Sequence, residues 1–355
     1  GRRSLMAISI SEHHNRWSSH ITRQEVSAWL CTLILFVALL FFSVYFIGKG
    51  FIEIPLSEVW KILGRGEATN EVWHDVVLHI RLPRVLGALL IGAILGCSGC
   101  MFQALLLNPL ASPYTLGVSG GAAFGGACAI YLGLSKPIFP AFLGGLVSLL
   151  LVLSMSKRRG NFQPENLVLA GIIVSSVFSA GISFIKHLFG EEVGSLVFWL
   201  MGSLVGIRSV EVLWLLPFAL GIVVLGILSA KALDLLCLGD KTARQSGVST
   251  RTLRLSLLVI ATLSTAAAVS VGGVIAFVGL VVPHIFRIAF GPLHRYLLPL
   301  SALGGALLLL VSDNLVRVCF GVEIPVGVLT TLIGGPFFFY LFVQKISWQG
   351  NHGKS

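Results

Sequence analysis

Ten stretches of mostly apolar residues, each about 20 residues long, recur along this 355-residue chain. A helix needs about 20 such residues to cross the hydrocarbon core of a bilayer. Only 11% of the residues are charged, whereas a soluble domain carries roughly a quarter. We therefore predict an all-α polytopic membrane protein whose spans lie at about 28–48, 83–105, 115–134, 137–156, 165–186, 210–231, 253–271, 274–290, 299–317 and 327–345.

The basic residues divide unevenly between the two sides of this arrangement. With the N-terminus inside, 16 of the 25 Lys and Arg residues fall on the inner side and nine on the outer side. Cytoplasmic loops of membrane proteins are enriched in Lys and Arg, so we predict that both termini are cytoplasmic. The chain then divides into an N-terminal tail at 1–27, a ten-helix membrane domain at 28–345 and a C-terminal tail at 346–355.

Three segments outside the spans are long enough to form structure of their own. Residues 49–82 form an outer loop, and residues 232–252 form an inner loop that contains several apolar side chains. The outer segment 187–209 includes an amphipathic piece around 195–204 that suits the membrane surface. The Gly272–Gly273 pair separates the seventh span from the eighth, because glycine weakens helix continuity.

Several short motifs resemble enzyme sites but stand in the wrong context. The run GVSGG at 117–121 fits the pattern G-x-S-x-G, yet that nucleophile elbow follows a strand, and here it opens an apolar stretch. The sequence contains neither a zinc-binding spacing nor a P-loop, so we expect no metal or cofactor on this chain and no ATP hydrolysis by the P-loop route. The net charge of +10 is not arranged as a basic stripe interleaved with aromatic residues, which argues against nucleic acid as a partner.

Charged residues near membrane depth give sharper predictions, because such charges are costly and usually functional. Asp313 and Arg317 lie four residues apart on one helix face, so we predict an ion pair between them. Arg81 and Arg84 flank Pro83 at the entrance of the second span, where the helix dipole disfavours cations. Guanidinium groups bind carboxylates in a forked geometry, so we predict that these two arginines bind an acidic partner.

Six motifs in a fixed order, covering about 75–345, carry a resemblance to one family. Together they resemble the permease subunits of ABC importers for iron siderophores, haem and cobalamin, which have the type II importer fold of ten helices. The motifs are RLPRVLGALLIGA (81–93), QALLLNPLASPYTLGVSGGAAFG (103–125), LGDKTARQSGV (238–248), GGVIAFVGLVVPHIFR (272–287), HRYLLPLSALGGALLLLVSDNLVR (294–317) and EIPVGVLTTLIGGPFFFYLF (323–342).

The resemblance implies a location and a set of partners. The chain would lie in the bacterial inner membrane and pair with a second permease copy, usually as a homodimer. Two cytoplasmic ATPase subunits would hold ATP and Mg²⁺, and a periplasmic substrate-binding protein would dock from outside. Transport would proceed by alternating access, with no catalytic residue in the permease itself.

The resemblance also implies roles for individual residues. Arg81, Arg84 and Arg317 would receive acidic residues of the binding protein. The inner gate would lie at Pro164 and Glu165, where some family members carry small hydroxyl residues instead. The inner loop would form coupling helices, bent by its two glycines and facing the ATPase through its polar residues and Ala243. The coupling residues so implied are Leu238, Gly239, Asp240, Lys241, Ala243, Arg244 and Gly247.

Two other functions stay open on the sequence alone. A secondary transporter driven by an ion gradient needs buried acids for coupling, and Asp313 is the only acid well inside a predicted span. A membrane thiol oxidoreductase would use Cys97 and Cys100 of a C-x-x-C motif, although both lie in the middle of an apolar helix. The resemblance leaves the cargo open among siderophores, haem and cobalamin, and iron chelates are the commonest cargo in the family.

Overall fold

The computed structural model of the chain describes residues 2–66, 69–134, 136–158, 161–320 and 323–352. Within these ranges, one helix lies at each of the ten predicted spans. These helices are α1 (Arg2–Gly48), α4 (Leu82–Leu105), α5 (Val118–Tyr131), α6 (Ile138–Ser156), α7 (Pro164–Phe189), α9 (Ser209–Leu228), α12 (Thr250–Gly272), α13 (Val278–Phe290), α14 (His294–Phe320) and α15 (Val326–His352).

Shorter elements occupy the segments between these helices. The outer loop folds into α2 (Leu56–Arg65), α3 (Glu71–Asp75) and a π-helical turn, η1 (Val76–Arg81), that runs into α4. The predicted amphipathic piece is α8 (Gly194–Leu200), which follows the 3-10 turn η2 (Gly190–Val193), and the inner loop forms α10 (Ala230–Cys237) and α11 (Asp240–Gln245). A small antiparallel hairpin, β1 (Lys157–Arg158) and β2 (Asn161–Phe162), joins α6 to α7.

The ten helices differ in length relative to the membrane. Seven of the helices in the described ranges are long and apolar enough to cross a bilayer, whereas α5, α13 and the apolar part of α15 are shorter. The predicted spans 115–134 and 274–290 begin too early, because α5 starts at Val118 and α13 at Val278. The backbone explains both errors, because Gly117 (φ 71°) and Phe277 (φ 67°) adopt left-handed conformations that an α-helix cannot continue through.

Residues 2–27 of the predicted N-terminal tail are helical and continuous with the rest of α1, and residues 346–352 are likewise continuous with α15. Residue 1 and residues 353–355, which belong to the two predicted tails, lie outside the described ranges. The predicted break between the seventh and eighth spans is confirmed, since α12 ends at Gly272 and Gly273 follows with φ 69°.

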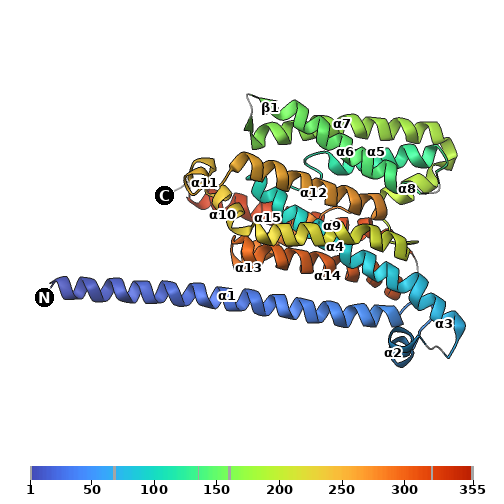
Figure 1. The fold of residues 1–355 in the computed structure, drawn as a ribbon, viewed down its shortest axis with the longest axis horizontal. Helices are drawn as coiled ribbons and strands as arrows, with labels where there is room; N and C mark the ends of the chain where they lie inside the picture. The colour runs from blue at the N-terminus through green and yellow to red at the C-terminus, as the bar shows by residue number, and fades with distance from the viewer. Residues whose placement is uncertain (1, 67–68, 135, 159–160, 321–322, 353–355) are drawn as a thin grey trace.

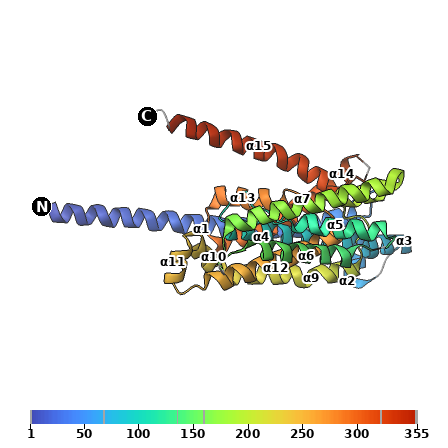
Figure 2. The same cartoon turned by 90° about the horizontal axis from the view of Figure 1, so that it is seen from above.

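The helices run roughly parallel in one bundle, with both termini at the same end (Figure 1). Helix α4 is at its centre, because 78% of its span is buried, against 17% for α1. Helices α5, α6 and α7 form a layer on one side, and α15 diverges from the bundle toward the C-terminus (Figure 2). Helices α2 and α3 lie at the end opposite α10 and α11, as the predicted topology requires.

Glycines let the central helices approach closely, which is how membrane helices commonly pack. A Cβ added at Gly96 would lie 2.0 Å from the carbonyl oxygen of Ser301 on α14. One added at Gly99 would lie 1.7 Å from the carbonyl oxygen of Gly279 on α13. These contacts fix the register of α4 against α13 and α14, and so fix the position of the charged residues on each helix.

Candidate functional site

A buried charged cluster lies at the outer end of α4 and α14. Arg84 binds Asp313 through two hydrogen bonds, from Nε to Oδ2 at 2.8 Å and from Nη2 to Oδ1 at 2.9 Å. Its third nitrogen, Nη1, donates to Oε1 of Glu323 at 3.0 Å. This is the bidentate geometry in which an arginine binds a carboxylate most strongly, and it joins the second predicted span to the ninth.

The other two arginines of this outer cluster bind the end of α1. Arg81 donates to the backbone carbonyl oxygens of Ile47 at 2.8 Å and Gly48 at 3.0 Å, and also to that of Ile52. Arg317 donates to the backbone carbonyl oxygen of Phe46 at 3.3 Å and to the side-chain oxygen of Asn314. The backbone of residues 46–52 therefore supplies hydrogen-bond acceptors to two buried cations, which would be costly to bury without them.

Two expectations about this cluster were wrong. Asp313 pairs with Arg84 rather than with Arg317, because the close packing of α4 on α14 brings a guanidinium from another helix against it. The three arginines, which the resemblance places as an exposed docking surface, are also buried in the chain, since Arg81 is 4% accessible and Arg84 and Arg317 are each 8% accessible. The sequence did not identify Glu323 as a partner of Arg84, although Glu323 lies shortly after the end of the ninth predicted span, 299–317.

The inner loop forms the two short helices that the resemblance implied. Gly239 (φ 109°) and Gly247 (φ 83°) bend the backbone on either side of α11, as expected. Leu238 and Lys241 are exposed, as a surface for a partner requires. Ala243, in contrast, is fully buried, so the expectation that it faces a partner was wrong.

Two polar contacts hold α11 against the start of α12. The carboxylate of Asp240 accepts from Nη2 of Arg254 at 2.9 Å and from Nη1 at 3.3 Å. Nε of Arg244 donates to the hydroxyl of Thr250 at 3.1 Å. All four side chains thus join the coupling segment, residues 238–247, to α12, and α11 cannot move far without α12.

The predicted inner gate lies against this same segment. Gln163 and Pro164, at the start of α7, line a small cavity of about 90 Å³ together with Asp240, Arg244 and residues at the start of α12. Glu165 is exposed. The structure therefore brings Pro164 of the expected gate together with the coupling residues Asp240 and Arg244.

A contact that the sequence did not reveal joins α10 to α14. Oδ1 of Asp234 accepts from the backbone N–H of His294 at 2.9 Å and lies 2.6 Å from its ring Nδ1. Asp234 thereby caps the N-terminus of α14, where a negative charge is favoured by the helix dipole. The only sequence signal was an acid within the apolar run LDLL at 233–236.

The C-x-x-C cysteines are both fully buried in α4, and the five cysteines whose side chains are described are all free thiols. A buried thiol in apolar surroundings is inert, because reaction needs an accessible thiolate. Replacing Cys97 and Cys100 together with alanine is therefore expected to leave the activity of the chain in reconstituted vesicles near the wild-type level. Loss of activity with normal folding would favour the oxidoreductase alternative.

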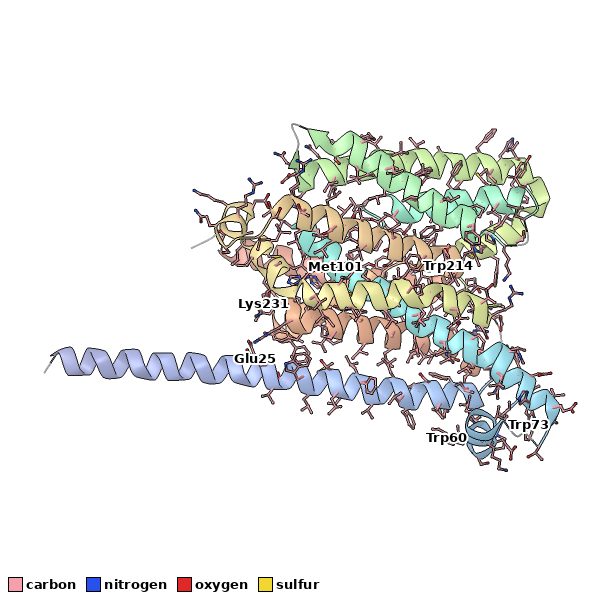
Figure 3. The ribbon with its side chains drawn as sticks, viewed as in Figure 1. Glu25, Trp60, Trp73, Met101, Trp214 and Lys231 are labelled. Atoms are coloured by element: carbon pink, nitrogen blue, oxygen red, sulfur yellow. The ribbon has the colours of Figure 1, made fainter. Side chains whose placement is uncertain are left out.

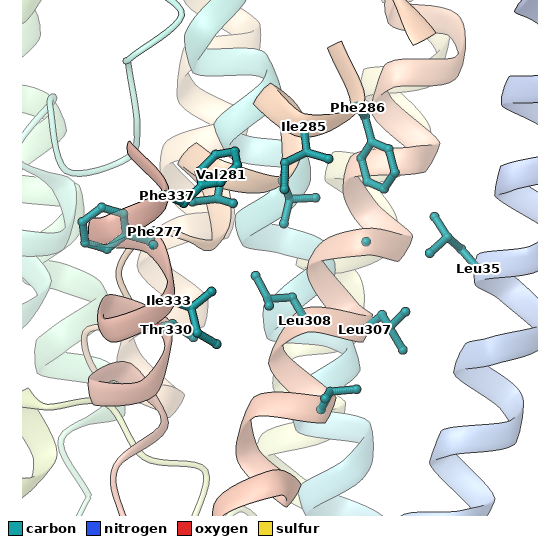
Figure 4. A pocket seen from close by; sticks show the side chains of 14 residues that line it. Leu35, Phe277, Val281, Ile285, Phe286, Leu307, Leu308, Thr330, Ile333 and Phe337 are labelled. Carbon is teal, nitrogen blue, oxygen red and sulfur yellow. The ribbon is translucent and has the colours of Figure 1, made fainter. Parts of the chain in front are cut away.

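An apolar groove lies between α1, α13, α14 and α15 (Figure 4). It has a volume of about 410 Å³, and its lining includes Leu35, Phe277, Leu307 and Ile333. The described lining residues carry no ionisable group, so this groove offers surface for hydrocarbon rather than for a charged cargo.

Comparison with known proteins places these features in a family. The FecCD transport family matches residues 34–344. A hemin transport system permease of Yersinia pestis is 38% identical over 300 residues, covering 82% of this chain and 89% of the relative. An Fe(3+)-citrate import system permease of Bacillus subtilis is 36% identical over 326 residues, covering 90% and 96%.

Two further relatives extend the similarity. A vitamin B12 import system permease of Vibrio vulnificus is 35% identical over 332 residues, covering 89% of this chain and 95% of the relative. A solved ABC transporter of the metal-chelate type, in an inward-facing conformation, is 33% identical with a TM-score of 0.78, covering 88% and 98%. Because the family match spans most of the chain and the fold agrees, this multi-pass membrane protein belongs to the FecCD transport family of ABC permease subunits.

Proposed function

We propose that this chain forms half of the membrane pathway of an ATP-driven importer for a metal chelate in a bacterial inner membrane. The proposal rests on α14, a single helix that joins the charged residues at the inner end of the molecule to the outer cluster. It begins at His294, which Asp234 ties to α10 of the inner loop, and it carries Asp313 and Arg317 of the outer cluster near its other end. A helix held at both ends can transmit a movement from one side of the membrane to the other.

The proposed cargo is an iron chelate or haem. Relatives named for hemin, Fe(3+)-citrate and vitamin B12 are 38%, 36% and 35% identical, so overall similarity does not separate these cargoes. The family resemblance favours iron chelates, and discrimination would reside mainly in the binding protein. The chain itself is proposed to be non-catalytic, since its sequence contains no P-loop.

The proposed assembly contains a second copy of this chain, two cytoplasmic ATPase subunits and one periplasmic binding protein. Exposed apolar side chains along α7, including Leu169, Val177 and Phe184, support a pathway at the interface of two copies. The exposed Leu238 and Lys241 on the coupling segment support an ATPase contact at the other end. Pro164 and Glu165 are proposed as the inner gate because the coupling helix lies beside them.

Docking of the binding protein is proposed to involve Arg81, Arg84 and Arg317, with one change from the simplest scheme. Each arginine already has partners within the chain, so an incoming acid must exchange with one of them. Glu323 is the best candidate for exchange, because its side chain is 35% exposed while that of Asp313 is 3% exposed. Docking would then replace Glu323 on Arg84 and leave the Arg84–Asp313 pair in place.

The function is tested by reconstituting the chain with its ATPase and its binding protein in lipid vesicles. Vesicles in which the ATPase faces the lumen and the binding protein is outside are expected to accumulate a ⁵⁵Fe-labelled chelate or haem only when ATP is enclosed in the lumen. Cobalamin serves as the competing cargo. Accumulation driven by a proton or sodium gradient without the ATPase would instead establish the secondary-transporter alternative.

The coupling contact gives a prediction about efficiency. Asp240→Ala removes the bonds to Arg254 and leaves α11 with only the Arg244–Thr250 bond to α12, so α11 should carry α12 and the start of α7 less tightly. The ratio of chelate transported to ATP hydrolysed is expected to fall about tenfold, within the usual range of coupling free energies. Gln245→Ala, an exposed change on the same helix, is the control. An unchanged ratio in the Asp240 variant would contradict the proposed route.

A further inference from the structure

A hollow of about 430 Å³ lies between the end of α1 and the start of α2. It is lined by Tyr45, Gly48, Lys49, Glu53, Ile54, Pro55 and Leu56. The hydrophobic span of α1 runs from Gln24 to Gly48, so the hollow begins where that span ends. This is the depth at which the hydrocarbon of the outer leaflet gives way to lipid headgroups.

The polar side chains of the hollow form one exposed ion pair. Nζ of Lys49 lies 2.6 Å from Oε1 of Glu53, and the two side chains are 36% and 74% exposed. Their hydrogen bond raises the pKa of Lys49 and lowers that of Glu53, so both groups are charged at neutral pH. An exposed ion pair of this kind is weak, because water screens its charges, so each member can exchange its partner for an outside charge.

An apolar surface adjoins this charged hollow on the α1 side. The ring of Tyr45 stacks on that of Phe41, with centroids 6.1 Å apart and planes inclined by 13°. Phe41 is exposed, as are Val37 and Leu33 farther along the helix. A continuous hydrocarbon-facing strip therefore leads up α1 to the hollow.

A second apolar surface adjoins the hollow on α2. Val59 and Ile62 are buried against the protein, while Leu56, Trp60 and Leu63 form the exposed edge of the same apolar face. Trp60 lies at the outer end of the molecule (Figure 3), and tryptophan is enriched at the membrane–water interface. The polar hollow could therefore hold the headgroup of a phospholipid, and the two apolar surfaces beside it could hold the acyl chains.

We propose that this hollow binds an outer-leaflet phospholipid with a zwitterionic, amine-bearing headgroup. The lipid phosphate binds Lys49 in place of Glu53, and the lipid ammonium group binds Glu53 in place of Lys49. Each side chain therefore keeps a partner whose charge is opposite to its own. The acyl chains lie along Phe41 of α1 and beside the exposed edge of α2. Charge complementarity and the depth of the site favour a lipid over a second protein here.

A lipid in this hollow would affect transport because the hollow adjoins the backbone segment that binds Arg81. Gly48, which lines it, also presents its carbonyl oxygen to Arg81, as do the neighbouring residues Ile47 and Ile52. A bound headgroup would therefore hold the backbone segment that covers the outer cluster. The proposal does not depend on which chelate is carried, and lipid binding can be measured without transport.

The test is native mass spectrometry of the full chain, purified in detergent and titrated with phosphatidylethanolamine, phosphatidylglycerol or phosphatidylcholine. The wild-type chain is expected to retain phosphatidylethanolamine about tenfold more strongly than phosphatidylglycerol, a difference of about 1.4 kcal/mol. Lys49→Ala should weaken retention of all three lipids. Glu53→Gln should remove the preference for the amine headgroup while keeping phosphate binding.

Lys61→Ala is the matched control, because Lys61 lies on α2 outside the hollow and is paired with Glu58. Retention equal to wild type in both hollow variants, or an equal loss in the control, would overturn the proposal. Weaker docking of the binding protein to Lys49→Ala in lipid-free detergent would also overturn it, since the surface would then be a protein site. Circular dichroism and gel filtration establish that each variant is folded.

Discussion

Gly99→Ala is expected to destabilise the folded chain by about 3 kcal/mol or more, a large effect for a single added methyl group. The new Cβ would lie 1.7 Å from the carbonyl oxygen of Gly279 and 2.5 Å from its Cα, so the backbones of α4 and α13 would have to separate. Neither atom belongs to a flexible side chain that could turn away. Thermal unfolding in detergent and the yield of monodisperse protein measure the effect.

Gly221→Ala provides the control for this experiment. Gly221 lies within α9, and a Cβ added there would have no heavy atom within 4 Å. Alanine is the better helix former by up to about 1 kcal/mol, so this variant is expected to be as stable as the wild type or more stable. Equal melting temperatures for the two variants would show that close approach of α4 and α13 does not limit the stability of the bundle.

The second large effect is expected at the buried ion pair. Arg84→Ala leaves the carboxylate of Asp313, which is 6% accessible, without its bidentate partner. Asp313→Ala in turn leaves Arg84 buried with only Glu323. Removing one member of a buried pair costs about 3–5 kcal/mol, because the remaining charge is uncompensated. Denaturant unfolding of the purified chain measures each loss.

The double variant distinguishes a buried pair from two independent side chains. With Arg84 and Asp313 both replaced by alanine, neither member of the pair stays buried without the other, and the carboxylate of Glu323 is 35% exposed, so the loss should be smaller than the sum of the two single losses. Glu323→Gln, at the exposed side of the cluster, is expected to cost no more than about 1 kcal/mol. Additive single losses would contradict a direct pairing of Arg84 with Asp313.

The helices of this chain could be predicted because hydrocarbon selects them by composition. A polar residue at membrane depth is costly, so each apolar run of sufficient length marks a helix. The helix starts at Val118 and Val278 could not be predicted in the same way. They depend on the left-handed backbone of Gly117 and Phe277, and a phenylalanine gives no sequence signal for that conformation.

The candidate sites show a different limit. The sequence identified the charged residues at the outer end, because charges stand out in an apolar chain, but it assigned Asp313 the wrong partner. Helical periodicity describes one helix at a time, whereas Arg84 reaches Asp313 from 229 positions away. The contact of Asp234 with His294 is likewise set by the packing of α10 on α14. Such pairs follow from tertiary packing, which local patterns do not encode.

The attachment of α14 at both of its ends restricts how the bundle can change shape. A slide of α14 along its own axis by one helical turn, about 5.4 Å, would separate Arg84 from Asp313 and Asp234 from His294 at the same time. It would also drive Gly96 and Ser301 out of their close contact. Tilting α4, α14 and α10 together breaks none of these bonds. Conformational cycling is therefore expected to be rotation of a rigid three-helix unit, with hinges outside it.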